Sequence, residues 1–290
     1  MLILTKHIGQ LCNQIWSFLP IIAYAEHTQS KVCILNARED YISLFPALQK
    51  YKRVRWINLC NGEIGKLWRK VTRFAEKHTR PFEGKLNGSF FGIRQINGWE
   101  YSHDESFIKE HKQTLLRLFT PDREVLQKVG DVFNGYDGIT VGVHVRRGDY
   151  REWCDGAYCY PDEVWIRIMR DLANEAMKQH QNIRFLICSN EALTIKDSKL
   201  TLLQIPDTDG ITDLYGLAKC DYIIGPPSTY SQWASFYGDV PLCLILQPNQ
   251  KISFKDFSPI VLLDEFANKN RLRLNEKTER FYMEYNDAKE

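Results

Sequence analysis

The sequence predicts an α/β protein of two domains, with a parallel β-sheet in the second. Three observations lead to this prediction. The chain has 290 residues, which is enough for two cores, since a domain usually holds on the order of 100 to 150 residues. Short apolar runs alternate with helix-like segments along the chain. In the second half these runs are continuous, which is typical of a parallel sheet covered by helices on both faces.

The first half begins in the order strand, helix, strand, helix, strand. The three predicted strands are short apolar runs at Leu2–Thr5, Val32–Asn36 and Val54–Leu59. Between the first two, apolar side chains at spacings of three and four fall on one face of a predicted helix: Leu11, Ile15, Phe18, Ile22 and Ala25. Residues 61–98 hold glycines among aromatic and basic residues without a clear period, and we expect them to be irregular and partly helical.

Two further helices are predicted at residues 104–119 and 121–133, the second with Pro121 at its start. Turn-forming residues at 134–138 follow, and we place the domain boundary there. We expect an N-terminal α/β domain, a second α/β domain and a C-terminal tail that forms a surface helix. Their predicted bounds are 1–135, 136–264 and 265–290.

The second domain has five apolar runs that predict its strands, at residues 139–145, 183–188, 201–205, 222–224 and 240–246. Parallel sheets of this kind bind ligands at the carboxyl ends of their strands. Polar residues follow three of these ends, at 144–149, 189–191 and 226–229. We therefore expect the functional site at this edge of the sheet.

Composition and charge exclude several classes of protein. A net charge of +2 gives no concentrated basic face, so we expect no nucleic-acid partner. The longest nearly uncharged stretch, Ile8–Ala25, contains polar residues and lacks a basic leader, so we expect neither a secretory signal nor a transmembrane segment. The eight cysteines are scattered, which favours free thiols in a reducing compartment. Cys154 and Cys159 lack the partners of a zinc site, and no metal is expected.

Two adjacent arginines, Arg146 and Arg147, stand at the mouth of the strand at 139–145, and Gly148 lets the backbone turn after them. Guanidinium groups match phosphate oxygens in pairs, stay charged at any useful pH and stabilise a diphosphate leaving group as its charge grows. The pair therefore favours a diphosphate site that needs no divalent metal. The alternative is a surface ion pair with Asp149.

A second phosphate-binding element is predicted after the strand at 222–224. Ser228 and Thr229 stand at the start of a helix, where free N–H groups and positive potential attract phosphate. The alternative is that they only cap the helix. Upstream, Asp213 opens a short helix, where it either caps the helix or accepts hydrogen bonds from the amine and ring N–H of a guanine.

Together these motifs resemble those of the α-1,2-fucosyltransferases (glycosyltransferase family 11) and of related α-1,6- and protein O-fucosyltransferases. The motifs are His-x-Arg-Arg-Gly-Asp-Tyr at 144–150, Gly-Gln-Leu-Cys-Asn-Gln at 9–14 and the block at 213–237, and they cover most of the chain. The resemblance implies a GT-B fold, in which two Rossmann-like domains face each other across a cleft. It also implies that the first domain lies on the acceptor side and that the second binds a GDP-sugar.

The activity implied by the resemblance is inverting transfer of L-fucose from GDP-fucose to a hydroxyl of a glycan acceptor, with α-1,2 linkage. GDP-fucose and the glycan are the expected partners, and no metal or other cofactor is required. We expect a cytoplasmic location, either free or peripheral at a membrane where glycans are assembled.

Carried over by position, the resemblance assigns roles to individual residues. Donor-binding roles fall on Asn13, His144, Arg146, Arg147, Asp213, Ser228, Thr229 and Tyr230. Arg146 is implied to contact the β-phosphate, and Asp213 the guanine. Cys12 stands where the family has a second glycine, which would place this loop less closely against the donor.

The catalytic residues expected for this reaction are Arg146, Asp149 and Glu152. In a single displacement, a carboxylate usually takes the proton from the attacking hydroxyl. Asp149 matches the motif aspartate and is our first candidate for this base, although it could equally orient an arginine through an ion pair. Glu152 is the alternative base.

Two other functions fit parts of the sequence. Asp207-Thr208-Asp209 resembles the D-x-D motif of metal-dependent GT-A glycosyltransferases, although Pro206 and Gly210 around it favour an ordinary turn. A non-catalytic GDP-sugar-binding module is the other alternative, which the Cys12 departure allows and the intact arginine motif disfavours.

Overall fold

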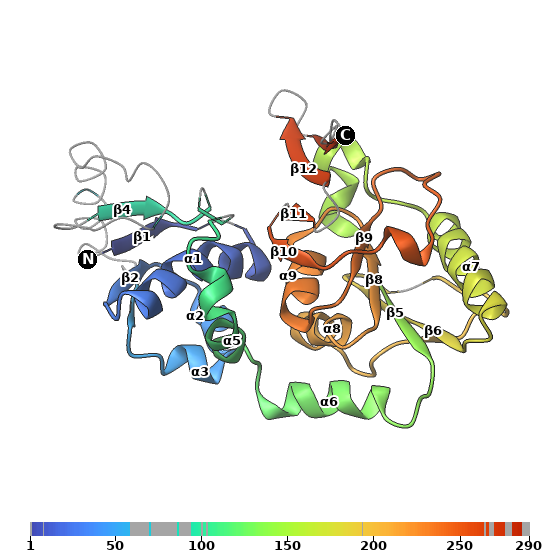
Figure 1. Cartoon of the computed structure of the whole chain (residues 1–290), viewed down its shortest axis with the longest axis horizontal. Helices are drawn as coiled ribbons and strands as arrows, with labels where there is room; N and C mark the ends of the chain where they lie inside the picture. Colours follow the sequence, from blue (N-terminus) through green and yellow to red (C-terminus); the bar gives the residue numbers. More distant parts are fainter. Residues whose placement is uncertain are drawn as a thin grey trace. The chain divides into compact units, whose positions relative to one another are not determined.

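The chain folds into two compact units, which Figure 1 shows in a computed structural model of the protein. The first unit comprises Met1–Asp122 and the second Arg123–Glu290. The structure describes residues 2–7, 9–58, 70, 86, 94–99, 101–102, 104–192, 194–263, 265–266, 270–275 and 280–285. Most of the segment 61–98, predicted to be irregular and partly helical, lies outside the described residues.

The first unit contains a four-stranded parallel sheet in the order β3-β2-β1-β4. Its strands are β1 (Leu2–Lys6), β2 (Val32–Leu35), β3 (Val54–Ile57) and β4 (Arg94–Asn97). The three strands predicted from apolar runs are confirmed. Leu2 and Leu4 of the central strand β1 are buried, which places this strand in the core of the unit.

Four helices are described in the first unit: α1 (Leu11–His27), α2 (Glu39–Ile42), α3 (Pro46–Gln49) and α5 (Ile108–Leu118). Helix α1 is apolar over most of its surface and packs against β2 and α5, which buries Trp16 and Leu19 completely. Within the described part of the chain, every helix is too short or too polar to cross a bilayer.

The second unit contains a five-stranded parallel sheet in the order β7-β6-β5-β8-β9. Its strands are β5 (Ile139–Val145), β6 (Ile183–Ser189), β7 (Leu202–Leu203), β8 (Tyr222–Gly225) and β9 (Leu242–Leu244). Each coincides with a predicted apolar strand, so the parallel sheet expected from the sequence is confirmed.

Helices cover both faces of this sheet, with α7 (Asp162–Lys178) on one side of the strands and α8 (Gly210–Leu217) and α9 (Thr229–Gly238) on the other (Figure 1). Successive side chains of a strand point to opposite faces. Val143 of β5 therefore joins the core cluster that contains Trp165 of α7. Its neighbour Gly142 faces α8, where a Cβ would lie 2.6 Å from Leu217. His144 points to the same face as Gly142.

Helix α6 (Arg123–Phe133) belongs to the second unit, although the sequence places the boundary after it, at 134–138. The helix packs against α8, and Val125 and Val129 form its buried side. The predicted bounds 1–135 and 136–264 differ from the structural units for this reason, because periodicity reveals a helix but not the surface it packs on.

The C-terminal segment forms an antiparallel sheet, and the predicted helical tail at 265–290 is wrong for the described residues. Its strands pair in chain order and are β10 (Ile260–Leu262), β11 (Glu265–Phe266), β12 (Asn270–Asn275) and β13 (Arg280–Tyr285). Leu272 and Leu274 alternate with arginines, a period of two that favours a strand. They pair with Met283 and Phe281 of β13.

Gly238 provides a test of how α9 packs against α8. A Cβ at Gly238 would lie 2.0 Å from the carbonyl oxygen of Ala218, at the end of α8. Because that oxygen belongs to the backbone, we expect Gly238→Ala to lower the free energy of unfolding by about 1–3 kcal/mol in urea denaturation. Gly130→Ala in α6 is the matched control. Its Cβ would meet nothing within 4 Å, so it should be neutral or stabilise by up to about 1 kcal/mol. Equal effects of the two changes would contradict the close packing.

Candidate functional site

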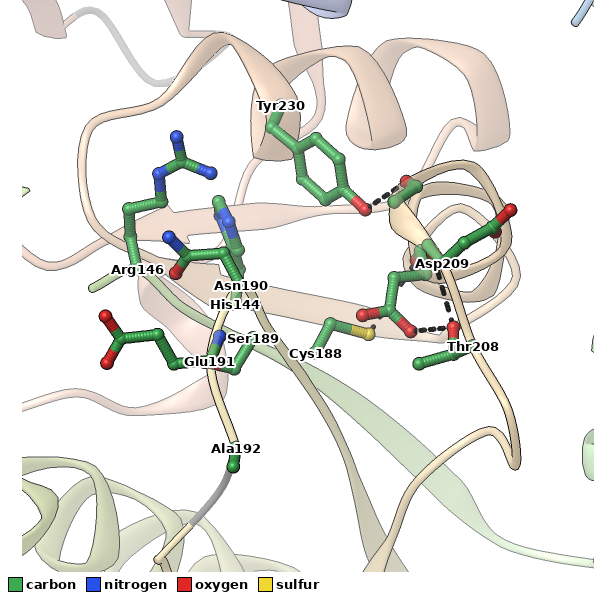
Figure 2. A pocket seen from close by; sticks show the side chains of 12 residues that line it. His144, Arg146, Cys188, Ser189, Asn190, Glu191, Ala192, Thr208, Asp209 and Tyr230 are labelled. Carbon is green, nitrogen blue, oxygen red and sulfur yellow. Dashed lines mark hydrogen bonds between the residues drawn. The ribbon is translucent and has the colours of Figure 1, made fainter. Parts of the chain in front are cut away.

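A pocket of about 430 Å³ lies where the carboxyl ends of β5 and β6 meet the N-terminal ends of α8 and α9. It is lined by His144 and Arg146, residues 188–192, residues 208–210, Asp213 and Tyr230. Figure 2 shows Arg146 on one side of the pocket and Thr208 on the other, with His144 between them. This is the edge of the sheet at which the sequence predicts the functional site.

His144 is an uncharged group inside the pocket. Its Nδ1 lies 2.7 Å from Ser231 Oγ in a hydrogen bond, and its ring centroid lies 4.8 Å from that of Tyr230. Burial, together with the charge of Arg146, lowers the pKa of His144 to about 3. The imidazole is therefore neutral at neutral pH and adds a polar group without a charge.

Arg146 reaches the pocket directly after β5. Gly148, with φ of +61°, begins the 3₁₀ helix η1 (Gly148–Arg151), which follows β5. Asp149 in this helix accepts a hydrogen bond from the Arg146 guanidinium at 3.0 Å. The Cζ of Arg146 lies 5.4 Å from the ring centroid of Tyr150. A guanidinium held in this way and only 16% exposed keeps a fixed direction toward an anion.

Arg147 points away from the pocket, and the structure thus separates the predicted arginine pair. Its guanidinium forms an ion pair with Asp162, the first residue of α7. Asn190 forms two hydrogen bonds with the Arg147 backbone. Its Oδ1 accepts from the Arg147 N–H at 2.9 Å, and its Nδ2 donates to the Arg147 carbonyl at 3.2 Å. Arg146 lines the pocket, whereas Arg147 fixes the loop that carries Arg146.

Asp213 is a buried carboxylate on α8 that lines the pocket. Thr208 donates a hydrogen bond from Oγ1 to its Oδ1 at 2.5 Å. Burial raises the pKa of Asp213 to about 6, although hydrogen bonds from Thr208 and Cys188 act in the opposite direction. The alternative in which Asp213 caps the helix is wrong, since the cap is Asp209, whose Oδ1 accepts the Thr212 N–H at 2.8 Å.

The start of α9 borders the pocket through Tyr230. Its hydroxyl donates to the Gly210 carbonyl at 2.6 Å and so joins the starts of α9 and α8. Ser228 caps α9 by accepting the Tyr230 N–H at 3.2 Å, which is one of the two roles predicted for it. Neither Ser228 nor Thr229 lines the pocket itself.

Besides Arg147, Ser228 and Thr229, three further predicted site residues lie outside the pocket. Asn13 belongs to α1 in the first unit, where the preceding Cys12 is buried. Asp149 is 54% exposed beside Arg146. Glu152 is exposed just after η1, and neither carboxylate lines the pocket.

Cys188 and Thr208 are pocket residues that sequence reasoning missed as site residues. Cys188 ends deep in the pocket and donates from Sγ to the Asp213 carbonyl at 3.7 Å. Burial raises the pKa of its thiol, which makes it unreactive. With Asp209 as the N-cap of α8, Thr208 lies directly before the cap and Asp213 at the fourth helical position. Apolar residues at these two positions often pack together, and here a hydrogen bond takes the place of that contact.

The two aspartates of the alternative D-x-D motif do not form a common site. Asp209 uses a carboxylate oxygen to cap α8, and Asp207 is exposed in the preceding turn with φ of +46°. Among the described residues, neither belongs to a cluster of side chains close enough to share a metal ion.

No protein-family model matches the chain. Alpha-1,2-colitosyltransferase of Escherichia coli is 23% identical to it over 186 residues. The aligned part is 60% of this chain and 60% of that protein, so the chain matches less than two thirds of its curated relative.

Solved structures with the same fold include three fucosyltransferases. Fucosyltransferase NodZ from Bradyrhizobium has a TM-score of 0.50 at 14% identity, covering 86% of this chain and 96% of that one. A mutant of FUT1 from Arabidopsis thaliana, in complex with GDP, has a TM-score of 0.51 at 12% identity, covering 98% and 82%. POFUT1 in complex with GDP-fucose has a TM-score of 0.51 at 11% identity, covering 87% and 97%. The resemblance to fucosyltransferases and the GT-B type of fold, with two parallel sheets and alternating helices, are thereby confirmed.

The raised pKa of Asp213 predicts that this carboxylate reduces stability at neutral pH. Its folded pKa of about 6 exceeds the ordinary value of 3.8, so stability is lost as the pH rises between these values. Asp213→Asn should therefore stabilise the protein on the order of 2 to 3 kcal/mol at about pH 7.5, and by little at about pH 4. Urea denaturation at both pH values measures this difference.

Asp207→Asn is the matched control for this change. Asp207 is exposed at positive φ, which asparagine tolerates, so its effect should stay within about 0.5 kcal/mol. A loss of stability in Asp213→Asn at both pH values would contradict the account of the buried carboxylate.

Proposed function

We propose that this chain transfers L-fucose from GDP-fucose to a hydroxyl of a glycan acceptor, with inversion at the anomeric carbon. The observation that carries the proposal is the pocket, which combines an arginine and a buried carboxylate at the carboxyl edge of one parallel sheet. GDP has complementary groups, namely an anionic diphosphate and a base with neighbouring N–H donors. The name of the Escherichia coli relative supports α-1,2 linkage, and the POFUT1 complex with GDP-fucose supports the donor.

Arg146 supplies positive charge for the diphosphate in this proposal. Its guanidinium lines the pocket in partly desolvated surroundings, where a charge-assisted hydrogen bond is stronger than in water. The start of α8 at Gly210 borders the same pocket and adds partial positive charge. As the bond between the sugar and the β-phosphate oxygen breaks, these groups stabilise the charge that grows on GDP. The proposed reaction therefore needs no metal cofactor.

Asp213 selects guanine in this proposal. Its ionised carboxylate can accept hydrogen bonds from both the ring N–H and the amine of guanine, while Thr208 holds one of its oxygens in place. Uracil offers a single N–H, so part of this buried acceptor would stay unpaired at a cost in affinity. With a pKa of about 6 the carboxylate is mostly ionised at neutral pH.

The other donor-binding residues have indirect or untested roles. His144 and Tyr230 offer neutral rings beside the nucleotide. Ser228 and Thr229 at the start of α9 remain proposed phosphate contacts, and Asn13 a proposed contact from the first unit. Arg147 acts by fixing the loop through Asp162.

The ion pair with Arg146 favours a positioning role for Asp149 over the role of base. Glu152 remains the alternative base, since its exposed carboxylate is free to meet an acceptor hydroxyl. The proton of that hydroxyl leaves to the base as its oxygen bonds to the anomeric carbon.

The proposal includes a cytoplasmic location, either free or peripheral at a membrane where glycans are assembled. Its support is that the described cysteines are free thiols, most of them buried. Proteins that keep many free thiols usually reside in reducing compartments.

The experiment that tests the function is transfer from labelled GDP-fucose to a panel of glycans, with the linkage of the product determined by NMR. We expect a fucosylated product that forms equally in excess EDTA, and no transfer from UDP-sugars. Turnover that is lost in EDTA and restored by manganese would favour Asp207 and Asp209 and the metal-dependent alternative. Binding of GDP-fucose without transfer to any acceptor would favour the non-catalytic module. Transfer of colitose and not of fucose would show that the proposed donor sugar is wrong, an outcome that the name of the Escherichia coli relative allows.

Arg146→Lys tests the geometry of the phosphate contact because it keeps the charge. Lysine is a point charge that cannot make a two-pronged contact with phosphate. Losing one charge-assisted hydrogen bond should lower kcat about tenfold to a hundredfold, with a smaller effect on GDP-fucose binding. Steady-state kinetics and calorimetry measure the two effects.

Arg147→Lys is the matched control, since its side chain lies outside the pocket and pairs with Asp162. It should keep a higher kcat than Arg146→Lys while losing stability. Asp149→Asn should lower kcat moderately if Asp149 only orients Arg146, and should abolish turnover with intact GDP binding if it is the base. Near-normal kcat in Arg146→Lys would contradict the role of this arginine.

A further inference from the structure

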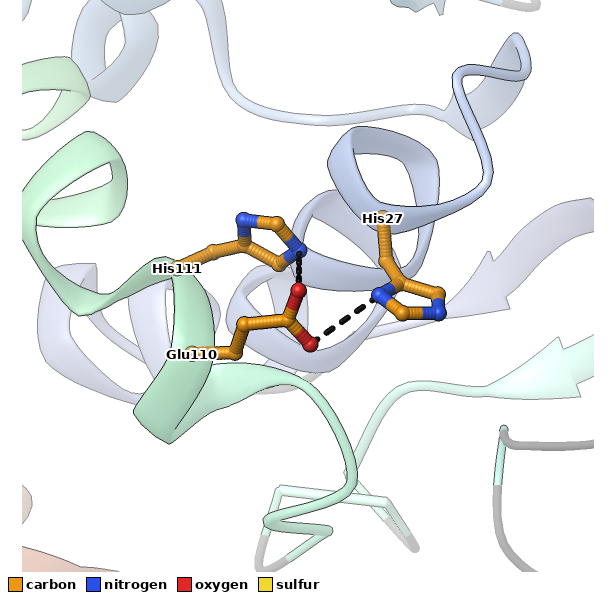
Figure 3. A group of neighbouring side chains, drawn as sticks. All are labelled: His27, Glu110 and His111. Carbon is orange, nitrogen blue, oxygen red and sulfur yellow. Dashed lines mark hydrogen bonds and ion pairs between the residues drawn. The ribbon is translucent and has the colours of Figure 1, made fainter.

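We propose that His27, Glu110 and His111 form a binding site for a divalent transition-metal ion, with zinc the best fit. Figure 3 shows the three side chains pointing toward one another, His27 from the end of α1 and the other two from the start of α5. One ligand atom of each lies within 4.8 Å of the others. All three belong to the first unit and none lines the nucleotide pocket, so the inference does not rest on the proposed transfer.

The distances are close to those that a zinc ion requires. Glu110 lies between the two rings, with Oε2 at 3.0 Å from His27 Nδ1 and Oε1 at 3.5 Å from His111 Nε2. Ligands of a tetrahedral zinc ion lie about 3.3 Å apart, given bonds of about 2.0–2.1 Å. Because the Glu110 side chain is 57% exposed, it can turn by the small amount needed without repacking the core.

The chemistry of the nitrogen atoms favours a metal over a simple ion pair. His111 Nε2 is buried, and among the described residues it has no hydrogen-bond partner. Buried polar atoms are normally satisfied. A metal ion would accept a lone pair from one nitrogen of each ring and from a carboxylate oxygen of Glu110, and so satisfy all three groups together. Two histidines and one glutamate form a known zinc ligand set that leaves a fourth position for water.

Neighbouring groups hold the ligands in place before an ion arrives. The His27 ring stacks on Phe107, with centroids 4.0 Å apart and planes 19° apart. It also meets the His111 ring edge to face at 5.7 Å. Since α1 and α5 pack together, the two histidines need little ordering to bind. A bound ion would connect the end of α1 to the start of α5 and stabilise the first unit.

Zinc titration of the metal-free full chain tests the site. We expect one zinc ion per chain by calorimetry and a melting temperature that rises with zinc concentration, because the ion binds the folded state. His27→Ala and Glu110→Gln should each weaken binding tenfold or more and remove the thermal shift. Glu110→Gln preserves the size of the side chain, and circular dichroism of both variants checks that they fold.

His180→Asn is the matched control. His180 is exposed after α7 with φ of +55°, a conformation that asparagine accepts, so this variant should bind zinc as the unaltered chain does. Cobalt in place of zinc distinguishes the ligands, since thiolates give a strong charge-transfer band and histidine and carboxylate do not. No zinc binding, binding unchanged in His27→Ala and Glu110→Gln, or a thiolate band would each overturn the proposal.

Discussion

The parallel pairing of β5 with β6 and β8 is the constraint on which the pocket depends. Val145 pairs with Ser189, so the segments after β5 and β6 leave the sheet at the same point. On the other side, β8 ends beside His144. There Gly225 is required, because a Cβ would come within 2.9 Å of Ser231 Oγ and 3.1 Å of His144 Cβ. The strand register therefore brings together groups that lie far apart in the chain.

The loop after β5 is stabilised by an ion pair outside the pocket and by Asn190, which lines the pocket. Arg147 pairs with Asp162 of α7, and Thr194 donates a hydrogen bond to the same carboxylate. Asn190 satisfies both backbone groups of Arg147, much as a neighbouring strand would. A mobile arginine side chain loses considerable rotamer entropy when it binds an anion. Because Asp149 and Tyr150 already hold the Arg146 guanidinium and its backbone is fixed, this cost is smaller here.

The sequence predicts the features that depend on local pattern. Continuous apolar runs locate β5 at Ile139–Val145 and the edge where Arg146 lies. The sequence does not predict which residues and elements tertiary packing brings into contact. Arg147 forms an ion pair with Asp162 on α7 and so lies outside the pocket. Helix α6 belongs to the second unit because it packs against α8. The cap of α8 places Thr208 and Asp213 near each other, but the hydrogen bond between them depends on their buried surroundings. The predicted helical tail is wrong because Leu272 and Leu274 alternate with arginines, and this period of two is typical of a strand.

His144 and Asp213, two of the titratable groups that line the pocket, exchange the pKa ranges usually associated with their side chains. A histidine with a pKa of about 3 stays neutral throughout the range in which most enzymes work. Meanwhile a carboxylate with a pKa of about 6 occupies the range normally attributed to histidine. Of these two groups, Asp213 and not His144 is expected to titrate near pH 6. Ordinary pKa values would lead to the opposite expectation.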